Sequence, residues 1–274
     1  MKICGIDFTS VPTNRKPITL AEGELCGRVL QIDRVRLLPN MNDFSSFLRE
    51  SGPWVAAIDF PFGQPHKLIE DLRWPLTWQG YVKHVKQMGL EIFKQQLSGY
   101  FDKETGRQLL RRKVDELANS ISPMKLEYTP VGKMFFAGAQ LLLTSPCTIV
   151  PFRRRQPNTG VVVEGYPKLV AKAAGVVKYK DGPIDEQIDR KRARDSLIKW
   201  LLSSEPEISY GFCISLISSV VKECKEDSKG DRLDAVLCAV QAAWAYVQRN
   251  RNYGIPLDYN RLEGWIADPS LQNR

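Results

Sequence analysis

The chain has 274 residues, 43% of them hydrophobic and 26% charged, which is the composition of an ordinary globular protein able to bury a sizeable core. Its formal net charge of +8 favours a polyanionic partner, with nucleic acid, either DNA or RNA, as the first candidate. The longest helical apolar stretch, 235–247, is too short to span a bilayer and is interrupted by Gln241, so we expect no membrane segment.

Cysteine usage indicates the compartment. The six cysteines are scattered without a C-x-x-C pair, and with only two histidines a zinc site is not expected. This pattern is typical of a reduced, intracellular protein, and we expect a cytoplasmic location. The chain runs from Met1 straight into an apolar segment, which predicts no secretory signal peptide.

The first sixty residues predict the order β-β-β-α-β. Residues 2–8 and 54–60 are short apolar runs typical of buried strands, and both end in Ile-Asp-Phe. Between them, 18–25 and 28–38 alternate unevenly and predict a hairpin. A short helix over 42–49 follows the hairpin.

The cap of that short helix is predicted to be Asn42 or Asp43. The segment 65–155 then predicts a mainly helical insertion, because apolar residues recur there at helical spacing. Within it, 132–143 is either a buried helix or a hairpin segment. We expect one domain over 1–274 that contains this insertion.

The C-terminal part begins with a third buried strand at 160–164. A charged helix is predicted over 185–202, and the apolar segment 212–224 fits either a helix or a strand. The clearest helix of the chain is predicted over 231–248, where apolar residues form a stripe at helical spacing.

Acidic residues fall at the ends of the predicted buried strands and in the first turn of the last helix. Strands that end in an acid place carboxylates at the rim of a sheet, and two acids three residues apart share one helix face. Converging carboxylates are the ligands that Mg²⁺ and Mn²⁺ require. The candidate catalytic residues are Asp7, Asp59, Glu164, Asp231 and Asp234, and all of these except Glu164 are candidate metal ligands.

A simpler interpretation of these acids remains open. Asp7 and Asp59 also fit as caps of the turns that follow their strands. Glu164 fits as a surface residue at a strand edge. Asp231 and Asp234 fit as an N-cap and a first-turn acid, which the helix dipole favours.

Basic residues cluster in three places. The Pro-flanked loop with Arg153, Arg154 and Arg155 is a candidate nucleic-acid contact, as are Arg111 and Arg112 in the insertion. The third cluster, at 190–194, and the helical run at 111–113 equally fit a solvated helix face.

Five segments in chain order resemble a known family: G-I-D-F-T-S at 5–10, A-I-D-F-P-F-G at 57–63, E-G-Y-P at 164–167, G-D-R-L-D-A-V-L-C-A at 230–239 and E-G-W-I at 263–266. The chain is similar to domain-of-unknown-function family 429, predicted nucleases of the RNase H-like superfamily. The segments span nearly the whole chain, although 65–155 contributes little.

The resemblance implies an α/β fold with a five-stranded mixed sheet, a hairpin at one side, helices on both faces and a helical insertion. It also implies Mg²⁺ or Mn²⁺ chemistry on a phosphodiester, with Asp7, Asp59 and the Asp231/Asp234 pair as metal carboxylates. The D-x-x-D spacing resembles the Holliday-junction resolvase branch, which usually has Glu where this chain has Asp59.

The expected function is therefore a metal-dependent nuclease with a two-metal carboxylate mechanism. Two alternatives stay open. One is a non-catalytic nucleic-acid-binding protein that keeps the fold and its basic surface. The other is an actin-like ATP-dependent phosphotransferase, with which D-F-T-S at 7–10 is loosely compatible, although that loop lacks glycine.

Overall fold

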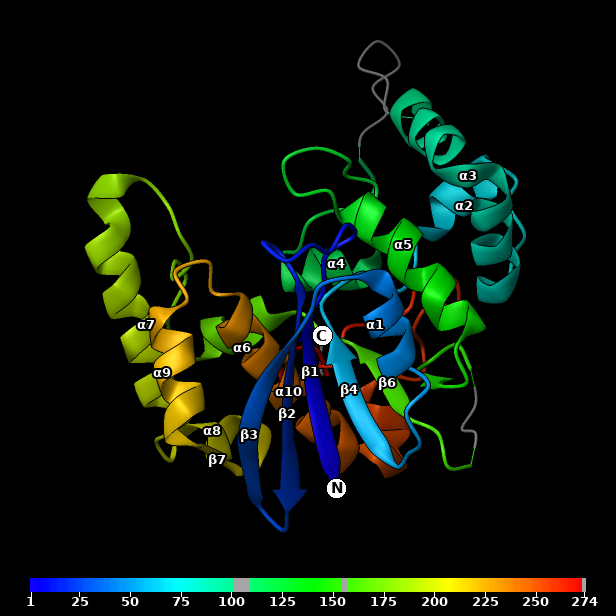
Figure 1. The fold of residues 1–274 in the computed structure, drawn as a ribbon. Helices are drawn as coiled ribbons and strands as arrows, with labels where there is room; N and C mark the ends of the chain where they lie inside the picture. The colour runs from blue at the N-terminus through cyan, green and yellow to red at the C-terminus, as the bar shows by residue number, and fades with distance from the viewer. Residues whose placement is uncertain (101–108, 154–156, 273–274) are drawn as a thin grey trace.

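The computed structural model describes residues 1–100, 109–153 and 157–272. Its centre is a seven-stranded mixed sheet with the strand order β5-β6-β4-β1-β2-β3-β7 (Figure 1). The strands are β1 Lys2–Asp7, β2 Ile18–Cys26, β3 Val29–Leu38, β4 Trp54–Ile58, β5 Thr148–Ile149, β6 Val161–Glu164 and β7 Cys213–Leu216.

The predicted buried strands and the hairpin are confirmed, but the expected number of five strands is wrong. β1 lies parallel to β4, β4 lies parallel to β6, and the β2–β3 hairpin is antiparallel to β1. Two short strands extend this arrangement: β5 pairs with β6, and β7 pairs with β3. β7 comes from the segment 212–224, whose apolar run is divided between this strand and a helix.

Helices cover both faces of the sheet. They are α1 Met41–Phe47, α2 His66–Asp71, α3 Trp78–Tyr100, α4 Lys113–Ala118, α5 Val131–Thr144, α6 Pro167–Ala173, α7 Gln187–Leu201, α8 Glu205–Tyr210, α9 Ser218–Glu226 and α10 Asp231–Val247. Four of them, α2 to α5, lie between β4 and β6, where the helical insertion is predicted. α1 is capped by Asn40, whose side chain accepts from the Asp43 amide at 2.9 Å, so the predicted caps Asn42 and Asp43 are wrong.

Strand alternation divides the core in two. Ile3 of β1 and Val163 of β6 pack on one face with α10 and α6, whereas Ile6 and Val162 pack on the other face with α1, α3 and α5. In Figure 1, α10 runs behind the strands and α1 lies in front of them. Throughout the part of the chain that is described, no helix combines the length and apolar character needed to cross a membrane.

Candidate metal centre

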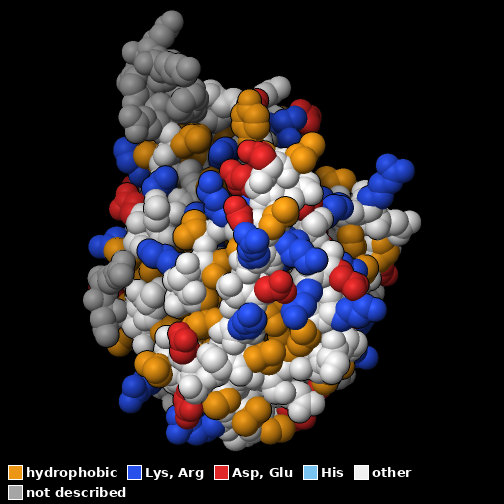
Figure 2. Space-filling view, turned by 90° about the vertical axis from the view of Figure 1, so that its left-hand side faces the viewer, with side chains coloured by type: hydrophobic (Ala, Val, Ile, Leu, Met, Phe, Trp, Pro, Cys, Tyr) orange, Lys and Arg blue, Asp and Glu red, His pale blue; other side chains and the backbone are white. Residues whose placement is uncertain are grey.

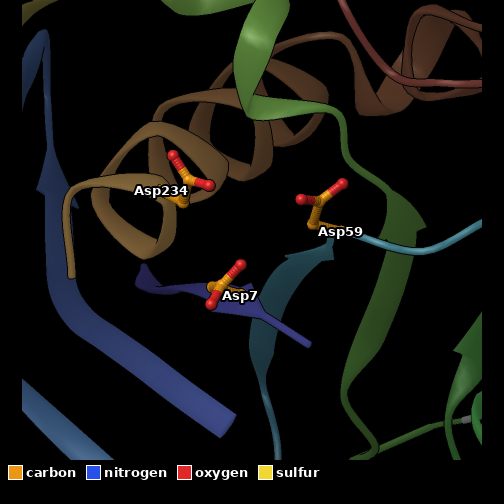
Figure 3. Close-up of side chains that lie close together, drawn as sticks. All are labelled: Asp7, Asp59 and Asp234. Carbon is orange, nitrogen blue, oxygen red and sulfur yellow. The ribbon is translucent and has the colours of Figure 1, made fainter. Parts of the chain in front are cut away.

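Three carboxylates meet at one end of the sheet. Asp7 is the last residue of β1, Asp59 follows β4, and Asp234 lies in the first turn of α10. One oxygen of each carboxylate lies within 4.8 Å of one oxygen of the other two. Figure 3 shows the three side chains facing a common space from their three elements. We call this group the acidic triad.

Two of its members are brought together by the sheet register. Ile6 of β1 pairs with Ile58 of the parallel neighbour β4, so Asp7 and Asp59 leave the sheet at the same edge. The amide of Asp59 donates to the carbonyl of Ile6 at 2.9 Å, which continues the ladder to the rim. The repeated Ile-Asp-Phe therefore marks two adjacent strand ends, as the sequence predicts.

The third member depends on the close seating of α10 on β1. A Cβ atom built on Gly5 would collide with the Ala235 carbonyl oxygen and the Ala239 amide nitrogen of the helix backbone. Gly5 therefore lets the two backbones touch, and this contact carries Asp234 to Asp7. Gly230, with φ of 76°, precedes the helix, and its carbonyl accepts from the Asp234 amide at 2.9 Å.

The triad is electrostatically costly. Burial, together with the negative charge of Asp234, raises the pKa of Asp7 well above its ordinary value. The same two causes raise the pKa of Asp59 to about 7. Burial also raises the pKa of Asp234, although Lys180 and Tyr179 oppose that shift. The three carboxylates thus resist ionisation in each other's presence unless a positive charge joins them.

Lys180 and Tyr179 are functional candidates that the sequence analysis missed. The Lys180 ammonium pairs closely with Oδ2 of Asp234, and the Tyr179 hydroxyl donates to its Oδ1 at 2.5 Å. The Lys180 side chain is 46% exposed, so one half-exposed cation faces three acids. These residues lie in an irregular segment between α6 and α7, and no local pattern marks them in the sequence.

Asp231 is not brought into the triad. It begins α10 half-buried, one turn before Asp234, and lines a separate surface pocket with Arg15, Lys229 and other residues. Its negative charge still contributes to raising the pKa of Asp7. The expected joint coordination by Asp231 and Asp234 is therefore not present in this arrangement.

Glu164 and Arg112 form a different group, which we call the Arg112 network. The Arg112 guanidinium donates to Glu164 Oε2 at 2.8 Å and to both Asp115 oxygens at 2.8 Å. The Phe62 amide also donates to Glu164 at 2.9 Å. The Arg112 side chain is only 1% exposed. The guanidinium is therefore buried and engaged by carboxylates of the protein, and Glu164 is held by an arginine rather than directed into the triad.

The other predicted nucleic-acid residues differ in their surroundings. Arg153 donates to the carbonyls of Leu143 and Ser145, each at 2.6 Å, and so satisfies the C-terminal end of α5 instead of pointing freely into solvent. Arg111 is exposed. Arg154 and Arg155 lie outside the described residues.

The third basic cluster lies on a face of the molecule where basic side chains form ion pairs with acidic ones. Figure 2 views the side of the molecule that carries α7 and α9, where basic and acidic side chains are mixed. Arg192 pairs with Asp189 at 3.2 Å, and Lys225 pairs with Asp195 at 3.8 Å. Arg194 is buried and donates to the Tyr179 carbonyl at 2.8 Å. Arg192 and Arg194 of α7 are thus engaged by the protein's own groups.

A pocket of about 380 Å³ opens beside the triad, and we call it the triad pocket. Asp59, Asp234 and Lys180 line it, and so do the three residues of the Arg112 network. Its aromatic and aliphatic lining includes Phe60, Ile121, Met134, Tyr166, Val177 and Tyr179.

The triad and its pocket define what the site can do chemically. Three carboxylate oxygens are hard donors of the kind that hold Mg²⁺ or Mn²⁺, and Asp7, Asp59 and Asp234 would be the residues that hold the ion. A pocket next to such an ion leaves room for a substrate. Comparison of the chain with protein-family models, with curated proteins and with solved structures finds no match.

Proposed function

We propose that the protein is a metal-dependent nuclease with an RNase H-like fold and that it hydrolyses the phosphodiester bonds of nucleic acid. The five inner strands support the fold assignment, because their order β3-β2-β1-β4-β6, with β2 antiparallel to its neighbours, is the hairpin-flanked mixed sheet that the sequence resemblance implies. The metal chemistry of such a site would then lie where β1 and β4 end.

The observation that carries the proposal is the acidic triad. Three carboxylates lie within 4.8 Å, and Lys180 supplies one positive charge against them. Burying like charges together is unfavourable unless a cation compensates them. A divalent ion balances the remaining negative charge and explains why a fold would keep three acids at this point.

The donor set fits one ion directly. Bound Mg²⁺ or Mn²⁺ supplies the activation of a water molecule and the stabilisation of the departing oxygen. A second ion needs a further ligand, and Asp231, half-buried one turn before Asp234, is the nearest carboxylate on the same helix. Asp7, Asp59 and Asp234 would hold the ion, while Lys180 would keep a positive charge beside the triad for a phosphate.

The test combines Mn²⁺ calorimetry with cleavage of labelled DNA and RNA strands. We expect Asp7→Asn to abolish saturable Mn²⁺ binding and to slow cleavage at least about a thousandfold while the variant stays folded. Asp231→Asn reports on the second ion, because the stoichiometry should fall from two to one. Asp189→Asn is the matched control, since it removes one acid at an exposed site on α7.

Two outcomes would contradict the proposal. Cleavage retained by Asp7→Asn would remove the triad from the reaction. Salt-dependent strand binding that is indifferent to chelator and to Asp7→Asn, with no cleavage, would favour the non-catalytic nucleic-acid-binding alternative. Stabilisation by ATP with Mg²⁺ would favour the phosphotransferase instead.

A further inference from the structure

The triad pocket is built to receive a largely apolar group. Phe60 follows β4, Met134 lies in α5, and Tyr166 and Val177 flank α6, so segments far apart in the chain converge on one cavity. Its volume of about 380 Å³ is within the range of small-molecule sites.

Several buried polar groups of the pocket are engaged already. Arg112 is held by Asp115 and Glu164, and the Ser120 hydroxyl donates to Asp115 at 2.7 Å. The Tyr179 hydroxyl is directed to Asp234. A ligand therefore meets mainly aromatic and aliphatic surface and few free hydrogen-bonding groups. Such a surface favours packing against the flat face of a ligand ring over hydrogen bonds to the edge of that ring.

Positive charge lies at the same pocket. Lys168 and Lys178 are exposed and line it, and Lys180 lines it as well and pairs with Asp234 of the triad. One ligand therefore meets apolar walls, lysine side chains and the triad within a single cavity. A nucleotide offers the complementary set, since it joins a flat base to an anionic phosphate.

We propose that the triad pocket binds one unpaired nucleobase of the strand whose phosphate lies at the triad. The inference rests on the proposed nuclease function and adds its substrate class, which is single-stranded or locally unpaired nucleic acid. A base in a duplex is stacked and paired, so it reaches a cavity beside the phosphate only after it leaves the helix. Stacking on aromatic walls also tolerates different bases, which predicts weak sequence preference.

The experiment places a larger side chain at an exposed residue that lines the pocket. Val177 lines the pocket and is 69% exposed, so Val177→Trp adds bulk there without disturbing the core. Ile184→Trp is the matched control, because Ile184 is 89% exposed and does not line the pocket. Each protein is tested with Mn²⁺ on a single strand, on its duplex and on a strand with one abasic residue at the cleavage position.

The wild type and Ile184→Trp should cleave the single strand about tenfold faster than the duplex, and removing the base should slow cleavage about tenfold. In Val177→Trp the single strand should already be cleaved slowly, and base removal should have little further effect. Equal loss on base removal in all three proteins, or equal cleavage of duplex and single strand, would overturn the base pocket while the nuclease function stands.

A binding measurement separates the two proposals. A single strand with 2-aminopurine is titrated in Ca²⁺, and its fluorescence should change on binding to the wild type and to Ile184→Trp but not to Val177→Trp. That pattern supports the base pocket even where no substrate is cleaved. A free nucleoside monophosphate that binds as tightly as the strand would overturn the strand assignment in favour of a small metabolite.

Discussion

The acidic triad and the Arg112 network hold the same kinds of residue with opposite consequences. The network is fully buried, whereas in the triad Asp234 is buried and Asp7 and Asp59 are half-buried. In the network, Arg112 donates to both Asp115 oxygens and to Glu164, and the Phe62 amide completes the shell of Glu164. In the triad, three carboxylates share one half-exposed lysine and one tyrosine hydroxyl. In the network Arg112 hydrogen-bonds both carboxylates and leaves one net negative charge, whereas the triad keeps two.

The difference shows how a buried acid is to be interpreted. Glu164 ends a strand, as Asp7 does, and Asp59 directly follows one, yet Glu164 is neutralised by a guanidinium of its own chain. A carboxylate becomes a candidate for metal binding when its neighbours leave its charge uncompensated. Removing the charge of Arg112 should therefore destabilise the network, whereas removing one carboxylate charge should stabilise the metal-free triad. Variants in the two regions test this directly.

We expect Arg112→Met to cause the largest loss of stability. The change leaves Asp115 and Glu164 buried without their partner, which typically costs about 3–5 kcal/mol. The melting temperature should fall by about 10 °C, measured by circular dichroism. Arg111→Met, at the exposed neighbouring position, is the control and should change the stability by less than about 0.5 kcal/mol.

Adding Glu164→Gln to Arg112→Met sharpens the interpretation. Neutralising Glu164 should recover part of the lost stability, because one unpaired charge is removed from the interior. An unchanged melting temperature in Arg112→Met would show that the network contributes little to the folded state.

The next effect concerns the seating of α10. Gly5→Ala places a methyl group against the backbone at Ala235 and Ala239, so the helix must shift. Such overpacking costs about 1–3 kcal/mol. The shift also moves Asp234 away from Asp7, so Mn²⁺ affinity measured by calorimetry should fall together with the melting temperature. Normal Mn²⁺ affinity in a destabilised variant would separate the helix contact from the geometry of the triad.

The pH dependence of stability should report the excess charge of the triad. Burial and Asp234 raise the pKa of Asp59 from 3.8 to about 7, with Glu164 adding to the shift and Lys180 opposing it. The folded state therefore holds a proton that the unfolded chain has lost. This contribution to stability is fully present below about pH 4 and is lost as the pH rises through about 7.

Asp59→Asn removes that pH dependence, because the amide stays neutral like the protonated carboxyl. Without metal, the variant should melt about 2–4 °C above the wild type at pH 8 and close to it at pH 4. The measurement is thermal unfolding with chelator at both pH values. A variant that is less stable than the wild type at pH 8 would show that the Asp59 carboxylate is compensated after all.

The smallest expected effect is on metal affinity in Lys180→Gln. The lysine ammonium pairs with Asp234, so a cation that binds the triad competes with it. Removing the ammonium should strengthen Mn²⁺ binding about fivefold, which is the size of a half-exposed ion pair. Lys178→Gln is the control, since Lys178 is exposed two residues away. Weaker binding in Lys180→Gln would show that the lysine supports the ion.

Much of the fold was predictable because its signals are local. The apolar runs that form β1, β4 and β6 and the stripe of α10 are visible in the chain, and each corresponds to an observed element. β5 was not predicted as a strand, and a strand at β7 was only one of two alternatives for 212–224, since these strands have two and four residues and owe their conformation to pairing with β6 and β3. The N-cap of α1 was predicted two or three residues too late, because several Asn and Asp residues stand together there.

The sequence alone determined that acids would lie at the ends of buried strands and at the start of α10. Hydrophobic periodicity and turn residues are local signals, so neighbouring residues are enough to predict these positions. Only the tertiary structure decided which acids meet. Asp7, Asp59 and Asp234 converge through strand register and the contact at Gly5, whereas Glu164 is captured by an arginine 52 residues earlier. Lys180 likewise reaches Asp234 across 54 residues, and such long-range charge compensation leaves no periodic trace in the chain.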